Sequence, residues 1–376
     1  MPVCWLSDDV VALDGDSDAQ RACEYTVAVA PAWRLARPYG CETEAQHGEQ
    51  RKRKKHKALA DADPPLNAAL ACAAARHALA LPALRRALLL YSAHAQSNSG
   101  QSDVPTAFAS PCGDASLPAL VAACEQGMPV TLSVVSGDSI CTQPLVGALH
   151  VNDSDTEGVA HLGDAVYRLP PRCRFALSSA ARLPGLLPTR CFTLLLLDPP
   201  WEAASVARSG CYTPLSPREV QALPVRALCD PRGALVALWV TNRERTRRHV
   251  EQKLLHAWGL SHVATWTWLK VCANGETVVP LEGGSAARRP YEVLLLCTSG
   301  PCVWQKGGAP PKDLVLLCPP AQHSRKPRLM GLLRDVAPEG AACELFAREL
   351  TAGVCCWGNE PLRFQAPDCF TSSNAV

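Results

Sequence analysis

The chain has 376 residues, of which 48% are hydrophobic, and its formal net charge at pH 7 is +2. This length exceeds that of one ordinary domain, and the hydrophobic content is sufficient for a sizeable core. We expect no membrane span, because no run of about 20 apolar residues occurs. We also expect no secretory signal, because the first residues lack a basic segment followed by an apolar one.

The nineteen cysteines are scattered along the chain, and none forms a CxxC pair. Without a secretion signal, we interpret them as reduced, mostly buried residues of a cytosolic or nuclear protein. A zinc site is the alternative, but the ligand spacing typical of zinc sites is missing, so we expect no metal.

Residues 1–65 are expected to be mostly disordered and contain one sharp feature, the basic run at residues 51–57 (RKRKKHK). Like charges at this density repel one another and stay solvated. The run indicates a nuclear localisation signal or an arm that contacts phosphates, with a solvated linker as the alternative. We therefore expect a nuclear protein, with the cytoplasm as a second location.

Residues 66–168 are interpreted as an accessory region with helices and some strands. Residues 66–94 are rich in alanine and leucine, and Pro82 is expected to divide them into two helical pieces. A short helix is predicted at 117–126, and strand-like stretches occur within 130–151. The role that we expect for this region is to widen a surface that binds nucleic acid.

The third region, residues 169–376, contains the most informative stretch. Residues 192–197 (FTLLLL) are a short apolar run stopped by prolines, which indicates a buried strand of a parallel sheet. Ligands bind beyond the carboxyl ends of such strands, so Asp198 is expected at the mouth of a pocket. Pro199 and Pro200 fix the backbone and remove two amide donors, while their carbonyls remain as acceptors.

This corner suits an amino group on a flat ring. The Asp198 carboxylate and the Pro199 carbonyl could each accept one N–H, and Trp201 could stack on the ring. An aromatic amine is a poor nucleophile because its lone pair is delocalised, and two fixed acceptors would draw the nitrogen toward tetrahedral geometry. The alternative is a strand that ends in an Asx turn beside a core tryptophan.

Further helices and strands are expected after Trp201. A capping box at residues 216–219 predicts the start of a helix, and residues 243–258 predict an amphipathic helix. Asn242 is expected to cap that helix, with contact to the methyl acceptor as the alternative. The arginines near the start of the helix either bind phosphates or form a solvated face. Strands are expected at residues 175–179, 233–240, 263–271, 291–297 and 344–346.

Two groups of charged residues follow the expected strand at 263–271, which contains two tryptophans. Pro327 is expected to start a helix, which would place Lys326 at a helix N-terminus that attracts anions. Glu344 lies on an expected strand, and a carboxylate at a sheet edge can bind ribose hydroxyls. The alternative is that Glu344 and Arg348 form an ion pair four residues apart.

Four motifs carry a resemblance to a known family: residues 198–201 (DPPW), 323–327 (HSRKP), 344–348 (ELFAR) and 357–360 (WGNE). They are similar to those of the DPPW-motif adenine-N6 methyltransferases, an MT-A70-like family, over about residues 169–365. The resemblance implies an α/β fold with a Rossmann-like class I methyltransferase sheet in circularly permuted motif order. It also implies S-adenosyl-L-methionine as the cofactor.

The resemblance also implies the residues of the site. The catalytic residues would be Asp198, Pro199, Pro200 and Trp201. The cofactor would be bound by Ser179, Asp198, Lys326, Glu344, Arg348, Asn359 and Glu360. The substrate would be bound by Trp201, Tyr212 and Lys326. Family members commonly have an acidic residue where this chain has Ser179.

The expected function is methyl transfer to the N6 amine of adenine in nucleic acid. RNA is the preferred substrate, including 2′-O-methyladenosine in small nuclear RNA, and DNA is the second. The base must leave its stack to reach such a pocket, so a single-stranded or flipped adenine is required. The alternative is a catalytically weak or inactive subunit that binds RNA or pairs with an active partner, which the serine at position 179 favours. A monomer and a complex with a second protein both remain open.

Overall fold

The computed structural model of the protein describes residues 3–7, 10–13, 66–97, 116–202, 214–272, 275–282, 289–301, 304, 310, 313–320 and 325–370. The basic run at 51–57 and Tyr212 lie outside the described residues. Among the described helices, none has both the length and the apolar character that crossing a membrane requires. The described cysteines are all free thiols and most of them are buried, as expected.

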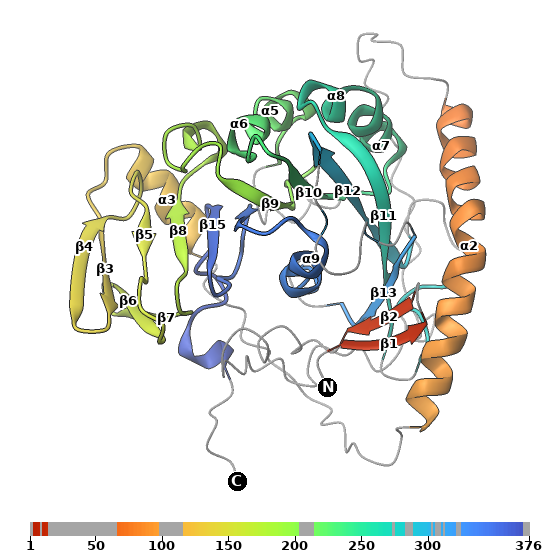
Figure 1. Ribbon diagram of the computed structural model, residues 1–376, viewed down its shortest axis with the longest axis horizontal. Coiled ribbons are helices and arrows are strands. Elements are labelled where there is room, and N and C mark those ends of the chain that lie inside the picture. The colour runs from red at the N-terminus through yellow and green to blue at the C-terminus, as the bar shows by residue number, and fades with distance from the viewer. Residues whose placement is uncertain are drawn as a thin grey trace, which may run out of the picture.

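Eleven strands of the described chain form one sheet, in the order β1-β2-β13-β11-β12-β10-β9-β14-β15-β8-β5 (Figure 1). Their bounds are β1 Val3–Ser7, β2 Val10–Leu13, β5 His150–Val151, β8 Arg174–Leu177, β9 Phe192–Leu197, β10 Ala234–Val240, β11 Ser261–Lys270, β12 Tyr291–Ser299, β13 Val315–Cys318, β14 Ala341–Leu345 and β15 Val354–Gly358. The six strands expected in residues 169–376 are all present, with ends shifted by a few residues.

The central strands β8, β15, β14, β9 and β10 run parallel to one another. Strand β12 is antiparallel to both of its neighbours, β10 and β11. The chain leaves β9 toward β10 on one side and leaves β14 toward β15 on the other, so the winding direction reverses between β9 and β14. In open α/β sheets this reversal opens a crevice at the carboxyl ends of the strands, which is where ligands bind.

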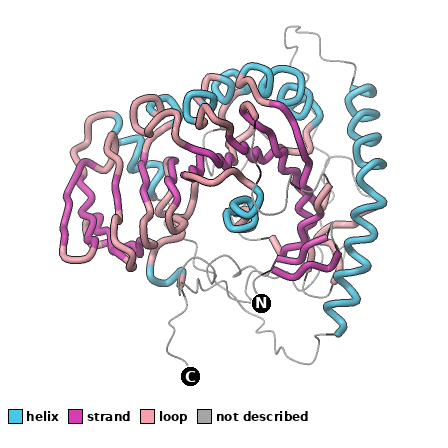
Figure 2. Tube along the Cα trace, viewed as in Figure 1, coloured by secondary structure: helices cyan, strands magenta, loops and turns pink. Residues whose placement is uncertain are grey.

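Both faces of the sheet are covered, which explains the unbroken apolar run in β9. Leu194 and Leu196 belong to one core cluster, with Leu333 of helix α9 (Met330–Val336). Leu195 and Leu197 belong to a second cluster on the opposite face. The helices of that face are α2 Leu66–Ser97, α5 Pro217–Gln221, α6 Val225–Leu228, α7 Glu244–His249 and α8 Leu255–Ala257, with η3 Val250–Leu254 between the last two (Figure 2).

The accessory region shares its core with the main sheet. A second sheet has the order β4-β3-β6-β7. It is built from β3 Thr131–Ser136, β4 Ser139–Pro144, β6 Gly158–Leu162 and β7 Ala165–Leu169, with α3 Leu117–Glu125 beside it. Its apolar side chains join the cluster that includes Leu194, and β5 pairs with β8 at the edge of the main sheet. The accessory region and residues 169–376 therefore share one hydrophobic core.

One expectation for the first hundred residues was wrong. Helix α2 is one continuous helix that contains Pro82, because the flanking residues are strong helix formers and Leu84 and Ala87 are buried beyond the proline. Proline removes only one backbone hydrogen bond, and this packing offsets the loss. Residues 3–7 and 10–13 form β1 and β2, and β2 pairs in parallel with β13, so this part of 1–65 is ordered by the sheet edge.

We predict that Leu84→Ala lowers the free energy of unfolding by about 2–5 kcal/mol, because it leaves a cavity between α2 and the sheet. The Leu84 side chain is 1% exposed, whereas Leu89 of the same helix is 73% exposed. Leu89→Ala is the matched control and should change stability by less than about 0.5 kcal/mol. Urea denaturation measures both variants, and equal effects would show that α2 does not pack as described.

Candidate active site

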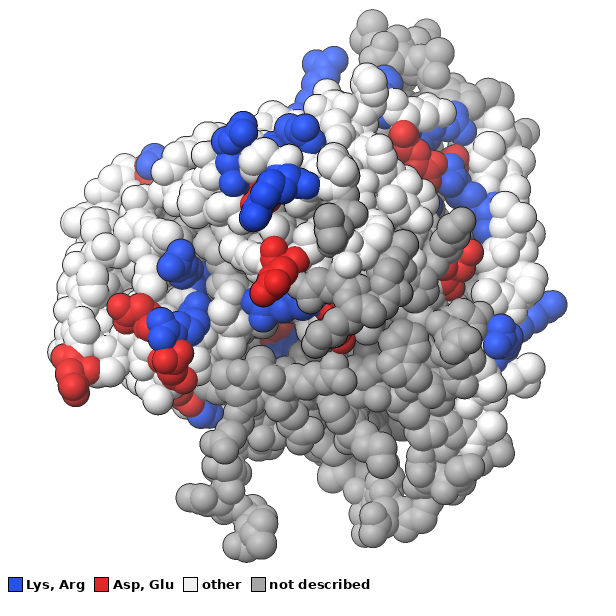
Figure 3. Space-filling model, in the orientation of Figure 1, with Lys and Arg blue, Asp and Glu red and all other residues white. Residues whose placement is uncertain are grey.

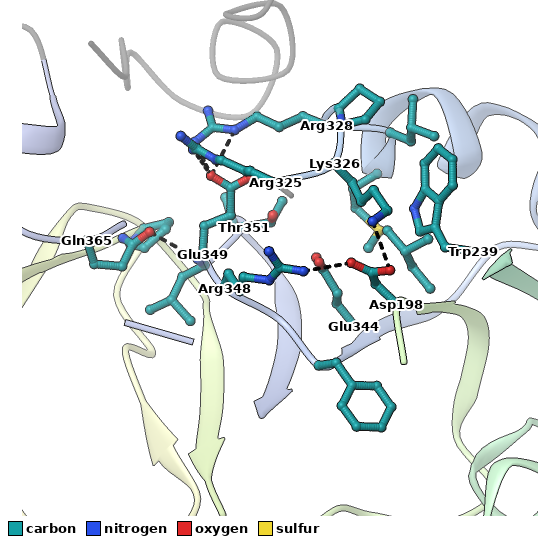
Figure 4. A pocket seen from close by; sticks show the side chains of 18 of the residues that line it. Asp198, Trp239, Arg325, Lys326, Arg328, Glu344, Arg348, Glu349, Thr351 and Gln365 are labelled. Atoms are coloured by element: carbon teal, nitrogen blue, oxygen red, sulfur yellow. Dashed lines mark hydrogen bonds and ion pairs between the residues drawn. The ribbon is translucent and has the colours of Figure 1, made fainter. Parts of the chain in front are cut away.

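A pocket opens at the carboxyl edge of the sheet, where the winding reverses between β9 and β14 (Figure 4). Asp198, which directly follows β9, lies on its wall. The charged residues that line it are Asp198, Arg325, Lys326, Arg328, Glu344, Arg348 and Glu349, and the larger apolar ones are Leu196, Trp239, Leu329, Met330, Phe346, Leu350 and Phe370. The pocket is thus a mixed site, with opposite charges set in an apolar frame.

Asp198 is held by two cations, one on each carboxylate oxygen. Lys326 Nζ lies 3.1 Å from Oδ1, and Arg348 Nη2 donates a 2.9 Å hydrogen bond to Oδ2. The Asp198 side chain is only 17% exposed, so both interactions form in a partly desolvated setting where charges interact strongly. The carboxylate therefore has a fixed orientation before any ligand enters.

Lys326 connects Asp198 to an acidic residue of β12. Lys326 Nζ is also 3.1 Å from Glu292, which in turn accepts a 2.6 Å hydrogen bond from Lys270. Burial would raise the pKa of Glu292, but Lys326 and Lys270 outweigh it and hold this pKa at about 2. Burial would likewise lower the pKa of Lys326, but Asp198 and Glu292 raise it. Both groups consequently stay ionised at neutral pH.

Arg348 connects Asp198 to an acidic residue that follows β15. Its Nε lies 3.7 Å from Glu360, and Glu360 also pairs with Arg363. The alternative that Arg348 pairs with Glu344 was wrong, because the two residues are not on one helix. Strand β14 ends at residue 345, and Phe346 follows with a φ of 65°, which turns Arg348 toward Asp198.

Glu344 is the carboxyl group of the pocket that lacks a described partner. Its carboxyl group has no hydrogen bond or ion pair to another described residue, and Figure 4 shows it beside Asp198. Burial raises its pKa to about 8, and the neighbouring Glu349 and Asp198 add to the rise. The side chain is partly exposed to the pocket, so this carboxyl is suited to a ligand that brings hydroxyl groups or positive charge.

A second cluster of charges ties the pocket wall together. Glu349 is buried and pairs with Arg325 and, at 2.6 Å, with Arg328. Burial alone would raise the pKa of Glu349, but the two arginines hold it at about 2. Arg325 lies within HSRKP, and Arg328 and Glu349 directly follow HSRKP and ELFAR. Their pairing was not predicted, because nothing in the sequence shows that the two motifs face each other.

Trp201 was expected to stack on the substrate, and the structure places it differently. The side chain is buried, and its indole N–H donates a 2.9 Å hydrogen bond to the Trp239 carbonyl. Trp201 is not among the described residues that line the pocket, whereas Trp239 is. The Trp201 amide also donates to the Pro199 carbonyl at 2.8 Å, so one lone pair of that acceptor is already used.

One expected helix start and one expected helix cap were also wrong. Helix α9 begins at Met330 and not at Pro327, so Lys326 lies in a segment without regular structure and not at a helix N-terminus. Lys326 attracts anions through its own charge, and this charge is already paired with Asp198 and Glu292. Asn242 does not cap α7, because its amide donates to the Tyr291 carbonyl at 2.5 Å.

The remaining expected residues lie along the same edge but outside the described lining of the pocket. Asn359 and Glu360 follow β15, and Ser179 follows β8 two strands away from β14. The Ser179 amide donates a 2.7 Å hydrogen bond to Glu125 of α3. The backbone thus sets Glu344, Asn359 and Ser179 in a row beyond three adjacent parallel strands, and only the first reaches the pocket.

Comparison with known proteins finds similarity over the segment that contains most of this site. Residues 192–360 match the MT-A70 family model. The chain is 37% identical over 255 residues to the human N(6)-adenine-specific methyltransferase METTL4, a match that covers 64% of this chain and 52% of the relative. The resemblance to the DPPW-motif adenine-N6 methyltransferases, and to METTL4 among them, is thereby confirmed for this part of the chain.

Two further relatives differ in the nucleic acid that their names specify. The N6-methyladenosine RNA methyltransferase MTA1 of Cryphonectria parasitica is 37% identical over 195 residues, which are 48% of this chain and 55% of the relative. A DNA N6-methyl methyltransferase of Caenorhabditis elegans is 29% identical over 225 residues, which are 58% of this chain and 59% of the relative. The chain spans about half the length of the relatives it matches.

We predict that Glu344→Gln flattens the pH dependence of stability between about pH 5 and pH 8. Because the pKa of Glu344 in the folded protein is about 8, above the ordinary value of 4.5, the folded state keeps a proton that the unfolded chain has released. This stabilisation is complete below about pH 4.5 and is lost as the pH rises through 8, at about 1.4 kcal/mol per unit. Urea denaturation at several pH values measures it, and parallel curves for variant and wild type would contradict it.

Proposed function

We propose that the protein is an S-adenosyl-L-methionine-dependent methyltransferase that acts on the N6 amine of adenine in nucleic acid. RNA is the preferred substrate, as adenosine or 2′-O-methyladenosine, with small nuclear RNA as a target, and DNA adenine is the second. The observation that carries the proposal is the Asp198 carboxylate, fixed by Lys326 and Arg348 in a pocket at the reversal of the sheet. Names of the relatives in the MT-A70 family support adenine as the base.

The order of the strands supports a circularly permuted Rossmann-like sheet. In space, β8-β15-β14-β9-β10 corresponds to the order 3-2-1-4-5 of a doubly wound sheet. Along the chain, however, the strands equivalent to 1 and 2 (β14 and β15) come last. The catalytic motif after β9 therefore precedes the cofactor residues after β14 and β15, which accounts for the absence of a glycine-rich loop before Asp198.

The residues present fit S-adenosyl-L-methionine. This molecule combines a positively charged sulfonium and ammonium with a carboxylate, a ribose and an adenine ring. Glu344 offers an unsatisfied acceptor for hydroxyl or cationic groups, and Arg348 offers a donor for a carboxylate or ribose oxygen. Leu196 and Phe346 supply apolar surface for a ring or methylene groups. When bound, the molecule supplies a methyl group with a neutral thioether as leaving group.

The chain's own residues position the acceptor amine. Asp198 accepts one N–H, and its two cationic partners restrict its rotation. The Pro199 carbonyl accepts the second N–H with the lone pair that the Trp201 amide leaves unused. Trp239 supplies the flat wall that was expected from Trp201. Catalysis is then orientation and electrostatic stabilisation without a strong base.

A catalytically weak or inactive subunit is the second candidate function. One observation favours it: both Asp198 oxygens are already engaged by cations, so an amine must share them or displace a cation. Calorimetry with S-adenosyl-L-methionine, followed by labelled methyl transfer to nuclear RNA and DNA with nucleoside mass spectrometry, separates the two. Cofactor binding without any methylated adenine would favour the inactive subunit, and absence of both would remove the enzyme proposal.

We predict that Asp198→Asn lowers kcat for methyl transfer by at least about 100-fold, because the amide keeps the shape but loses the charge that holds the amine. Asparagine is preferable to alanine, since it leaves a polar partner for Lys326 and Arg348. Asp138→Asn, in the exposed turn between β3 and β4, is the control and should retain full activity. Turnover of Asp198→Asn near the wild-type level would exclude the proposed role.

Nuclear localisation is likewise proposed, on the basis of the basic run at residues 51–57. Deletion of this run should shift a fluorescent fusion of the full chain toward the cytoplasm. A deletion of seven neighbouring residues outside the run, 58–64, serves as the control for shortening the chain. An unchanged nuclear fraction after the first deletion would dismiss the role.

A further inference from the structure

A second pocket lies on the opposite side of β12, where α2 crosses the sheet. Helix α2 contributes Arg76 together with several small apolar residues, and the strands contribute Thr267 and Tyr291. Arg247 of α7 and Arg289 complete the basic lining. Half of this pocket thus comes from a helix outside the segment that matches the MT-A70 family, residues 192–360.

Arg247 is the unusual member of the pocket. The residue is only 9% exposed, and its Nη2 lies 3.1 Å from Glu251. Its Nε and Nη1 are buried without a hydrogen-bond partner among the described residues. Unsatisfied buried donors cost about 1–3 kcal/mol, and more when the group is charged. A native protein tolerates this where a ligand supplies the missing acceptors.

The charges of the lining also favour an anion. Three arginines face the pocket against one described acid, Asp313. Glu244 and Glu251, which pair with Arg76 and with neighbouring arginines, do not line it. Figure 3 shows acidic and basic side chains close together in the region of α7 and α2. These acids hold Arg76 and Arg247 in place from outside the lining. The two unpartnered nitrogens of Arg247 are buried beneath the pocket wall, so a small movement of this side chain accompanies the binding of an anion.

This pocket is adjacent to the candidate active site through β12. Neighbouring residues of a strand point to opposite faces. Tyr291 accordingly lines the second pocket, while Glu292 binds Lys326, the partner of Asp198. The second pocket reaches this edge of the sheet at Asn242 and Tyr291, and it extends from there over the face of β11, β12 and β13. A flexible strand of nucleic acid that crosses this edge could place a base in one pocket and a backbone phosphate in the other.

We propose that the pocket formed by Arg76, Arg247 and Arg289 binds a backbone phosphate of the nucleic acid near the target adenine. The inference rests on the proposed function for the identity of the ligand. Arginine suits phosphate because its planar N–H groups match two oxygens at once. The accessory helix α2 thereby acts as part of the substrate-binding surface.

The first experiment measures binding without turnover. A single-stranded RNA that contains one adenine is titrated against the wild-type full chain and Arg247→Met at several salt concentrations. We expect about a tenfold weaker Kd and a slope of log K against log salt that is smaller by about 0.7, the value for one phosphate contact to a single strand. Lys253→Gln, exposed on the same helical segment, is the matched control, and an equal loss in both variants would contradict a specific site.

Arg289→Gln keeps the test valid if Arg247→Met does not fold, because Arg289 lies outside the helices. A second readout uses inorganic phosphate alone: it should raise the Tm of the wild type more than that of either variant. Sulfate and chloride at equal ionic strength distinguish specific binding from screening. A phosphate shift that is unchanged in both variants would overturn the proposal, even if the protein methylates RNA.

The sharpest test removes the phosphate instead of the arginine. RNAs with one neutral methylphosphonate linkage at each position around the adenine are compared in both proteins. One position should weaken wild-type binding about tenfold and have little further effect in Arg247→Met, because the two changes remove the same contact. Additive losses at every position would exclude the contact. Failure of methyl transfer with this coupling intact would instead disprove the proposed activity and leave the phosphate site standing.

Discussion

The structure of the candidate site depends on a carboxylate held between two cations. Asp198 comes from the end of β9, Lys326 from the segment before α9 and Arg348 from the segment after β14. These three segments are far apart in the sequence, and only the parallel order of β9 and β14 brings them together. Because each cation is itself paired with a further acid, Glu292 or Glu360, no member can move without leaving a buried charge uncompensated.

The sheet explains why this network lies where it does. Its strands are buried on both faces, so polar residues can appear only at the strand ends. The residues after β9, β14 and β15 and the start of the antiparallel β12 all meet at one edge. The pocket is thus a consequence of the topology, and the identity of the side chains at that edge determines its chemistry.

The sequence predicted the parts of this arrangement that depend on local pattern. The apolar runs of the six strands expected in residues 169–376, the position of Asp198 and the capping box at Ser216, with its reciprocal bonds to Glu219, were all correct. The errors concern long-range contacts. Whether Trp201 or Trp239 faces the pocket depends on how β9 and β10 twist past each other, and the partner of Arg348 depends on a turn at Phe346. The orphaned N–H groups of Arg247 likewise arise only from the packing of α2 over α7.

The connection between β14 and β15 spans only residues 346–353 and contains no helix. In most doubly wound sheets a helix at this position directs its dipole and backbone amides at the ligand. Here the positive charge of the pocket resides in replaceable side chains. A single codon change could therefore abolish ligand binding while the sheet remains folded, which offers a short evolutionary route from a catalytic chain to a scaffolding paralogue.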